Sequence, residues 1–81
     1  MDNWILYILE CRDRSLYTGI TTDLERRLKR HNEGRAAKYT RSRKPVKLVY
    51  HEACNSESQA KKREAEIKNM SRSKKLELIR S

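Results

Sequence analysis

The sequence predicts an α+β fold built on a small, mainly antiparallel sheet. Three segments are rich in β-forming residues, at 4–11, 16–20 and 46–52, and segments with helix-start signals follow the second and the third. The expected order is strand, strand, helix, loop, strand, helix, helix. Because 81 residues suffice for one modest core, we expect residues 1–81 to form a single domain.

The first predicted strand spans residues 4–11, where a near-continuous apolar run is typical of a strand covered on both faces. We therefore expect it in the centre of the sheet. Turn-forming residues at 12–15 separate it from the apolar run at 16–20, so the two runs most simply pair as an antiparallel hairpin. Gly19 is expected to end or bend the second strand.

The first predicted helix follows the hairpin. Thr22-Asp23-Leu24-Glu25 matches a capping box, in which the threonine hydroxyl and the glutamate satisfy free backbone N–H groups. This predicts a helix that starts at Thr22 and continues through residue 32 or 33. Gly34 is expected to stop it, because glycine readily takes the left-handed conformation that closes a helix.

The segment from Arg35 to Lys44 shows no convincing period and is expected to form a basic loop around Tyr39. Pro45 then opens the third strand, residues 46–52. Its even-numbered residues are expected to be buried and its odd-numbered residues partly exposed.

Two helices are expected at the end of the chain. Ser56-Glu57-Ser58-Gln59 is a second capping box, and it precedes a helix that carries Ala60, Glu64 and Ile67 along one stripe. Ser71 is expected to cap a short last helix.

Charge is the strongest feature of the composition. Lys and Arg number 20 against 11 Asp and Glu, which gives a formal charge of +9. Such an excess repels itself unless a polyanion neutralises it, so nucleic acid is the expected partner. The apolar residues, 36% of the chain, are nearly all needed for the core, so we expect function at the surface or in a shallow groove.

The sequence also disfavours several other classes of protein. No apolar run approaches the roughly 20 residues of a membrane span, and no helix joins a broad apolar face to a basic one. The acidic start, residues 1–4, leads into a short apolar stretch without a basic leader or cleavage site, so we expect a cytoplasmic protein. Cys11 and Cys54 form no CxxC pair, so free buried thiols are expected instead of a disulfide or a zinc site.

Polar residues fall on helix faces that are predicted to be buried. Arg27 and His31 lie beside the core stripe of the first helix, at the spacings of three and four that share a face with Leu24 and Leu28. Glu64 lies within the apolar stripe of the second helix, where a carboxylate needs a partner. The other basic residues of the first helix point elsewhere: Arg26, Lys29 and Arg30.

Two phenols, a guanidinium and a carboxylate converge if Tyr7 and Tyr17 lie on one face of the sheet. The two tyrosines share a face only if the hairpin register pairs residues whose numbers sum to an even value. The guanidinium of Arg27 and the carboxylate of Glu64 are then expected to meet over that face. Glu64 can hold one Mg²⁺ through an oxygen ligand, and Arg27 can bind a phosphate as negative charge builds in the transition state. A phenol can relay or remove the proton of attacking water. This is the inventory of a phosphodiesterase.

Ile5-Leu6-Tyr7 and Tyr17-Thr18-Gly19, followed by Arg27 and Glu64, resemble the ordered signature of the GIY-YIG nuclease superfamily. The likeness spans nearly the whole chain and is greatest to the short, stand-alone bacterial members, including at residues 16–28 and 38–41. More distant relatives include the nuclease modules of the excision-repair incision subunit and of structure-selective resolvases. The resemblance implies a three-stranded antiparallel sheet flanked by helices, with a metal-dependent site on its face.

The resemblance also implies roles for single residues. Tyr7 and Tyr17 match the signature tyrosines, with Tyr17 as the favoured general base or water-positioning group. Gly19 matches the glycine that lets the substrate approach.

On the helices, the resemblance assigns Arg27 to the substrate phosphate and Glu64 to the metal, and His31 matches a site position held by His or Tyr in relatives. Two features depart from the family pattern: Ile5 stands in place of a glycine, and the asparagine that some larger members carry after the glutamate has no counterpart. Slow activity, or a need for a protein partner, is consistent with these departures.

The basic loop is expected to bind phosphates, with Tyr39 as a stacking ring. Its candidate substrate-binding residues are Arg35, Lys38, Tyr39, Arg41, Arg43 and Lys44. The alternative for this loop is a solvated run of charge.

Structural alternatives also stay open for the site residues. The tyrosines can be packing residues of strands, and Arg27 can cover the core. Glu64 can pair with Lys68 at the surface, and His31 can simply end its helix.

The leading hypothesis is an endonuclease that depends on Mg²⁺ or Mn²⁺ and hydrolyses DNA, with Glu64 as the metal ligand. The rival hypotheses are that the same fold serves as a module that binds DNA or structured RNA without chemistry, or as a basic subunit of a ribonucleoprotein. We expect a monomer or a weak dimer.

Overall fold

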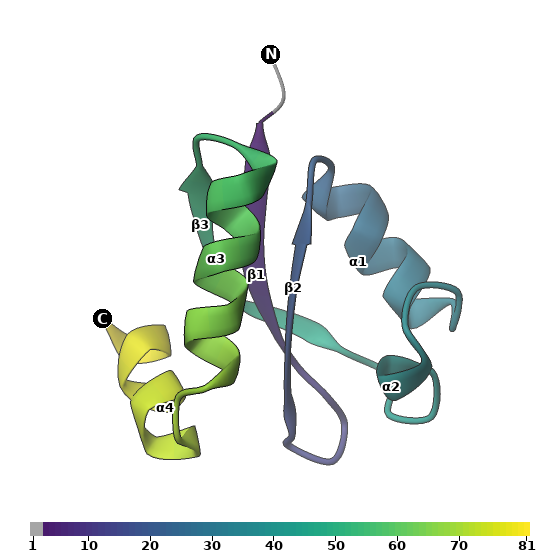
Figure 1. Ribbon diagram of the computed structural model, residues 1–81. Helices are drawn as coiled ribbons and strands as arrows, with labels where there is room; N and C mark the ends of the chain where they lie inside the picture. The colour runs from purple at the N-terminus through teal and green to yellow at the C-terminus, as the bar shows by residue number, and fades with distance from the viewer. Residues whose placement is uncertain (1–2) are drawn as a thin grey trace.

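The computed structural model describes residues 3–81, so Met1 and Asp2 of the acidic start lie outside the described residues. Its centre is one antiparallel sheet of three strands in the order β2-β1-β3 (Figure 1). The strands are β1 (Trp4–Glu10), β2 (Leu16–Thr21) and β3 (Lys47–Cys54). The predicted fold class and the predicted order of strands and helices are confirmed.

β1 is the central strand, as its apolar run predicts. Leu6, Tyr7, Ile8 and Leu9 are all buried, because helices cover both faces of the sheet. Since side chains alternate along a strand, Leu6 and Ile8 belong to one hydrophobic cluster and Tyr7 and Leu9 to the other.

The register of the β1–β2 hairpin answers the question that the sequence left open. Tyr7 pairs with Gly19 and Leu9 pairs with Tyr17, so the paired numbers have an even sum. Tyr7 and Tyr17 therefore lie on the same face of the sheet. β2 also continues past Gly19 to Thr21, so of the two expectations for Gly19, that it ends or bends the strand, the first is wrong.

The helices form two layers, one on each face of the sheet. On the Tyr7 face lies α1 (Leu24–Asn32), whose Leu24 and Leu28 pack against the hydrophobic cluster that contains Tyr7 and Leu9. The opposite face is covered by α3 (Glu57–Lys68), through Ile67, and by α4 (Arg72–Arg80). Figure 1 shows β2 between α1 on one side and α3 on the other.

The start of α1 differs by one residue from the predicted capping box. Asp23, not Thr22, is the N-cap, and its carboxylate accepts the backbone N–H of Arg26 at 3.1 Å. The reason lies in Thr21, whose hydroxyl accepts the backbone N–H of Asp23. This local turn keeps Thr22 outside the helix, so the helix begins after Asp23. The predicted end is confirmed, with Glu33 as C-cap and Gly34 at φ 76°.

The later helices start where the sequence predicts. Ser56 caps α3 and Ser71 caps α4, each accepting a backbone N–H three residues on. The second half of the box is shifted, because the side chain of Gln59 accepts the N–H of Asn55 instead of that of Ser56.

The segment 35–44 is not wholly a loop, because it contains the one-turn helix α2 (Lys38–Arg41). The backbone N–H of Arg41 and the hydroxyl of Thr40 both donate to the carbonyl of Ala37, which holds the turn. A single turn is too short to produce a hydrophobic period, so the sequence pattern does not reveal it.

The expectation that Leu48 and Tyr50 share one face of β3 is wrong, although more and less exposed residues still alternate from Tyr50 onward. Ile8 pairs with Tyr50 whereas Leu9 pairs with Leu48, so Val49 is an extra residue in a bulge. Leu48 packs in the Tyr7 layer, and Tyr50 packs in the Leu6 layer on the opposite face. One inserted residue exchanges the two faces of the rest of the strand.

Both cysteines are free, as expected, although only Cys11 is buried and Cys54 is partly exposed. Among residues 3–81, no helix is both long enough and apolar enough to cross a membrane.

Candidate active site

The phenol of Tyr7 lies directly over Gly19 of β2. A Cβ atom at Gly19 would come within 2.6 Å of Tyr7 Oη and 2.7 Å of its Cζ, well inside van der Waals contact. The space above this glycine is therefore filled by the ring of Tyr7. The resemblance implied that Gly19 lets the substrate approach, but in the structure it lets a side chain of the protein itself cross the edge strand.

A chain of hydrogen bonds leads from Tyr7 into the fold. Its hydroxyl lies 2.9 Å from Nε2 of His31, and Nδ1 of His31 lies 2.8 Å from the hydroxyl of Thr40. Thr40 donates its own proton to the carbonyl of Ala37 at 3.1 Å, so it accepts from Nδ1–H. Nε2 is then the acceptor, and Tyr7 donates to it.

Burial keeps both members of the Tyr7–His31 pair uncharged at neutral pH. Each side chain is 1% exposed. Burial, together with the nearby Tyr17, raises the pKa of Tyr7 to about 12. Burial, and then the charge of Arg27, lowers the pKa of His31 to about 4. The directions of proton donation along the chain are thus the stable ones at pH 7.

Tyr17 is the more accessible of the two signature tyrosines, because it is half-buried where Tyr7 is fully buried. Its ring packs edge-on against His31, with centroids 5.2 Å apart, and stacks with the ring of Tyr39 at 6.0 Å. The guanidinium of Arg43 covers the ring of Tyr39 at 4.0 Å. The ring of Tyr39 on α2 therefore packs against the site through Tyr17, which in turn contacts His31.

Arg27 and Glu64 approach the Tyr7 phenol from different layers. Both side chains are half-buried, and both affect the pKa of Tyr7: the charge of Arg27 lowers it and the charge of Glu64 raises it. The helices that carry them pack in different layers, α1 on the Tyr7 face and α3 on the other, and the expectation that the two charged groups meet over the tyrosine-bearing face stays a prediction. They act on one phenol because the phenol lies over β2, an edge strand that has a helix layer on either side.

Glu64 also makes the ion pair that the structural alternative predicts. Its Oε2 atom lies 3.1 Å from Nζ of Lys68, and the Glu64 side chain is 23% exposed. The residue is thus neither a free surface acid nor a buried unpaired one. A cation that binds this carboxylate must compete with the ammonium group of Lys68.

The donor set fits a metal that is held mainly by water and substrate. Within residues 3–81, no group of three or more His, Cys, Asp or Glu side chains gathers to hold an ion. Mg²⁺ is commonly bound through one or two carboxylates, with water and substrate phosphate completing its shell. Glu64 alone can meet that need beside a bound phosphate.

The predicted phosphate-binding residues of segment 35–44 divide into two groups. Arg43 is engaged within the fold, since it pairs with Asp13 at 3.0 Å and donates to the carbonyl of Tyr39 at 2.9 Å. Tyr39 is 39% exposed, and its ring contacts Arg43 and Tyr17. The remaining candidates are exposed: Arg35, Lys38, Arg41 and Lys44.

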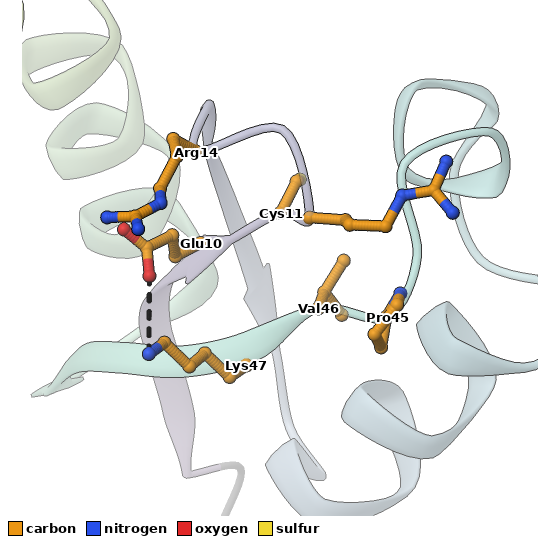
Figure 2. A pocket seen from close by; sticks show the side chains of 7 residues that line it. Glu10, Cys11, Arg14, Pro45, Val46 and Lys47 are labelled. Atoms are coloured by element: carbon orange, nitrogen blue, oxygen red, sulfur yellow. Dashed lines mark ion pairs between the residues drawn. The ribbon is translucent and has the colours of Figure 1, made fainter.

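A hollow of about 320 Å³ lies beneath the β1–β2 hairpin, apart from the tyrosines. None of the candidate catalytic residues lines it. Figure 2 shows the ion pair between two of its lining residues, Glu10 and Lys47, whose charged atoms lie 3.4 Å apart. The thiol of Cys11 borders this hollow, and burial raises its pKa. The feature offers no phosphate-hydrolysing chemistry.

Thr40 is a residue of the site region that sequence reasoning missed. It is fully buried and orients His31 through Nδ1. The only signal for it was that the stretch 38–41 resembles the same stretch of the short bacterial GIY-YIG proteins.

The site and the fold together define a nuclease-type domain. Residues 3–77 match the family model of the GIY-YIG catalytic domain, and the chain belongs to this family. More specifically, it is similar to proteins named UPF0213. The UPF0213 protein of Staphylococcus saprophyticus is 54% identical over 79 residues, which cover 98% of this chain and 96% of that protein. The UPF0213 protein of Syntrophus aciditrophicus is 58% identical over 76 residues, covering 93% and 87%.

Two solved structures are also similar. The solution NMR structure of a UPF0213 protein from Bacillus halodurans is 51% identical, has a TM-score of 0.62, and is matched over 95% of this chain and 82% of that one. The solution NMR structure of a protein from E. faecalis is 43% identical, with a TM-score of 0.63 and coverage of 93% and 80%. The family name indicates a nuclease-type domain, and the names of these relatives add no substrate.

Proposed function

We propose that this protein is an endonuclease that depends on Mg²⁺ or Mn²⁺ and hydrolyses phosphodiester bonds in DNA. The observation that carries the proposal is that a guanidinium, a carboxylate and a second phenol all influence the pKa of one phenol, which lies over the edge strand. Arg27 and Glu64 both act on the phenol of Tyr7, and Tyr17 lies on the same face. A basic chain of charge +9 suits a polyanionic substrate.

The roles follow from exposure and charge. Arg27 binds the scissile phosphate, where its fixed fork of N–H donors offsets the charge that develops on the oxygens. Glu64 holds the metal ion, which when bound supplies Lewis acidity at the phosphate and lowers the pKa of water. Tyr17, the more accessible phenol, positions the attacking water and accepts its proton.

Tyr7 and His31 support this arrangement from beneath. Because the Tyr7 hydroxyl donates a hydrogen bond to His31 Nε2, the lone pairs of its oxygen are free to accept a hydrogen bond from a neighbouring group. It can then accept a hydrogen bond from Arg27 and hold the guanidinium against the substrate. Both Tyr7 and His31 stay uncharged at pH 7, so they orient Arg27 without neutralising the positive charge that the phosphate needs.

The test is a cleavage panel of nicked, flapped, branched and single-stranded DNA with Mg²⁺, with Mn²⁺ and with chelator. Arg27→Ala and Glu64→Gln are each expected to lower the cleavage rate by about a hundredfold or more, because each removes charge stabilisation in the transition state. Glu66→Gln is the matched control, since Glu66 lies on the same helix and is exposed. Cleavage that survives both site substitutions, or needs no divalent metal, would contradict the proposal.

The Lys68–Glu64 ion pair favours a second candidate function, a module that binds DNA or structured RNA without cutting it. In such a module the ammonium group permanently occupies the carboxylate. Salt-sensitive binding without cleavage of any substrate, unchanged in Glu64→Gln, would support this candidate over the first.

A further inference from the structure

A hollow of about 270 Å³ adjoins the candidate active site, and Arg27 is part of its wall. The other lining residues come from the end of β2, the helix cap and α1: Thr21, Thr22, Asp23, Arg26 and Arg30. Three guanidinium groups thus face a single carboxylate, that of Asp23, which already accepts the N–H of Arg26 as the helix cap. The charge of this hollow favours an anion.

A second hollow, of about 280 Å³, continues from the first. It shares Arg26 and Arg30 with it and adds Lys29, Glu33 and Arg35. The two hollows therefore form one basic strip along the outer side of α1, which we call the α1 strip and define as Arg26, Lys29, Arg30 and Arg35. The strip begins beside Arg27.

The cations of the α1 strip form no ion pair with the described part of the chain, although Asp23 and Glu33 line the same hollows. Among residues 3–81, no carboxylate lies within 4 Å of their charged nitrogens, whereas the fold pairs Lys61, Arg63 and Lys68 of α3 with acids. All four strip residues are exposed. Their charge is therefore available to a partner.

The helix that carries three of the four strip residues is as long as a short length of nucleic acid backbone. α1 has nine residues, which at about 1.5 Å per residue span about 13 Å. One strand of a B-form duplex advances about 3.4 Å per nucleotide along its axis, so about four phosphates fit along the helix.

We propose that the α1 strip is the path of the DNA strand next to the scissile phosphate. This inference rests on the proposed function, because it takes Arg27 as the residue that binds the scissile phosphate. It places the main phosphate track on the α1 strip, which shares Arg35 with segment 35–44 but none of that segment's other candidate residues. In that segment Arg43 is paired with Asp13 and the ring of Tyr39 is in contact with Arg43 and Tyr17.

The test compares two double variants that remove the same charge. Arg26→Gln with Arg30→Gln changes the strip, and Arg72→Gln with Lys74→Gln changes exposed residues of α4, in the other helix layer. Binding to a labelled DNA duplex is measured by fluorescence anisotropy between about 50 and 200 mM salt, without divalent metal.

The strip variant is expected to bind DNA about tenfold more weakly at the upper salt concentration. Its plot of log affinity against log salt should lose about two units of slope, since each lost phosphate contact removes about one. The α4 variant should keep the wild-type slope. A strip variant with the wild-type slope, or an equal loss in both variants, would overturn the inference.

These binding measurements, together with the cleavage panel, separate the two proposals. If the wild type cleaves DNA but the strip variant binds as the wild type does, only the path is wrong. If the wild type neither cleaves DNA nor binds it in a salt-dependent manner, the proposed function fails as well. A second strip variant, Lys29→Gln with Arg35→Gln, gives an independent measurement if the first fails to fold, and the same loss of slope is expected for it.

Discussion

Replacing Gly19 by alanine tests whether this glycine exists to make room for Tyr7. The new Cβ would lie 2.6 Å from Tyr7 Oη, so the ring would have to move by several tenths of an ångström. It has nowhere to move, since Tyr7 is 1% exposed and bonded to His31. Overpacking of this kind destabilises by about 1–3 kcal/mol. Loss of the hydrogen bond adds about 1 kcal/mol.

Part of this loss is offset, because alanine in a strand is favoured over glycine by about 0.5–1 kcal/mol. We therefore expect Gly19→Ala to lower the free energy of unfolding by about 2 kcal/mol, combining these overpacking, hydrogen-bond and backbone contributions. Urea unfolding at neutral pH measures it. In a Tyr7→Leu background the loss should largely disappear, because the phenol that clashes is gone.

Gly34 provides the control, as the only other glycine of the chain. Gly34→Ala should lower stability by about 1 kcal/mol through backbone strain at φ 76°, without disturbing the Tyr7–His31 pair. If Gly19→Ala unfolds at the wild-type urea concentration, or loses as much stability in the Tyr7→Leu background, the close approach of Tyr7 does not explain this glycine.

Three further predictions concern the hydrogen-bond chain and the carboxylate. Thr40→Val leaves Nδ1–H of His31 without an acceptor and should lower the free energy of unfolding by about 1–3 kcal/mol, whereas Thr40→Ser keeps the hydroxyl. Nitrogen-15 NMR should show the His31 tautomer retained only in the serine variant. Equal spectra in both variants would refute the hydrogen-bond chain. Because the pKa of His31 is about 4 in the folded protein against 6.5 ordinarily, the unfolded chain binds a proton that the folded chain does not. The stability due to this group is full above pH 6.5 and falls as the pH drops toward about 4, and urea unfolding across that range should show a slope that His31→Gln lacks. Lys68→Gln removes the ion pair of Glu64, so it should lower the Mg²⁺ concentration for half-maximal cleavage while changing the free energy of unfolding by less than about 0.5 kcal/mol. A higher Mg²⁺ requirement would mean that Glu64 does not hold the metal.

Local chemistry explains why most of the elements were predictable. Ser56, Ser71 and Gly34 act at helix ends through hydrogen bonds and backbone angles that depend on a few adjacent residues. The apolar run of β1 is likewise visible without knowledge of its neighbours. The displaced start of α1 shows the limit, because two adjacent residues, Thr22 and Asp23, can both serve as caps and the choice depends on the preceding turn.

The bulge in β3 depends on partners that are distant in the sequence. Val49 is an extra residue only because Leu48 and Tyr50 pair with consecutive residues of β1. The segment itself alternates as a regular strand does. Its own pattern therefore contains no sign of the change of face.

The candidate site shows the same division. The face that Arg27 and His31 share on α1 was predictable from helical spacing, and Tyr7 and Tyr17 share a face once the register is known. The stripe that holds Glu64 predicts contact with the sheet but not which side of the sheet, because both sides of β1 are apolar. Its approach from the opposite layer depends on the three-dimensional path of the chain.

The position of the candidate site on β2 restricts how this small protein can be extended. β2 pairs only with β1 among the described residues, and its outer edge lies between the layers that supply Arg27 and Glu64. A fourth strand paired with β2, from another domain or a second copy, would separate the side chains of Arg27 and Glu64. Growth of the sheet that leaves the chemistry intact is therefore confined to the β3 side.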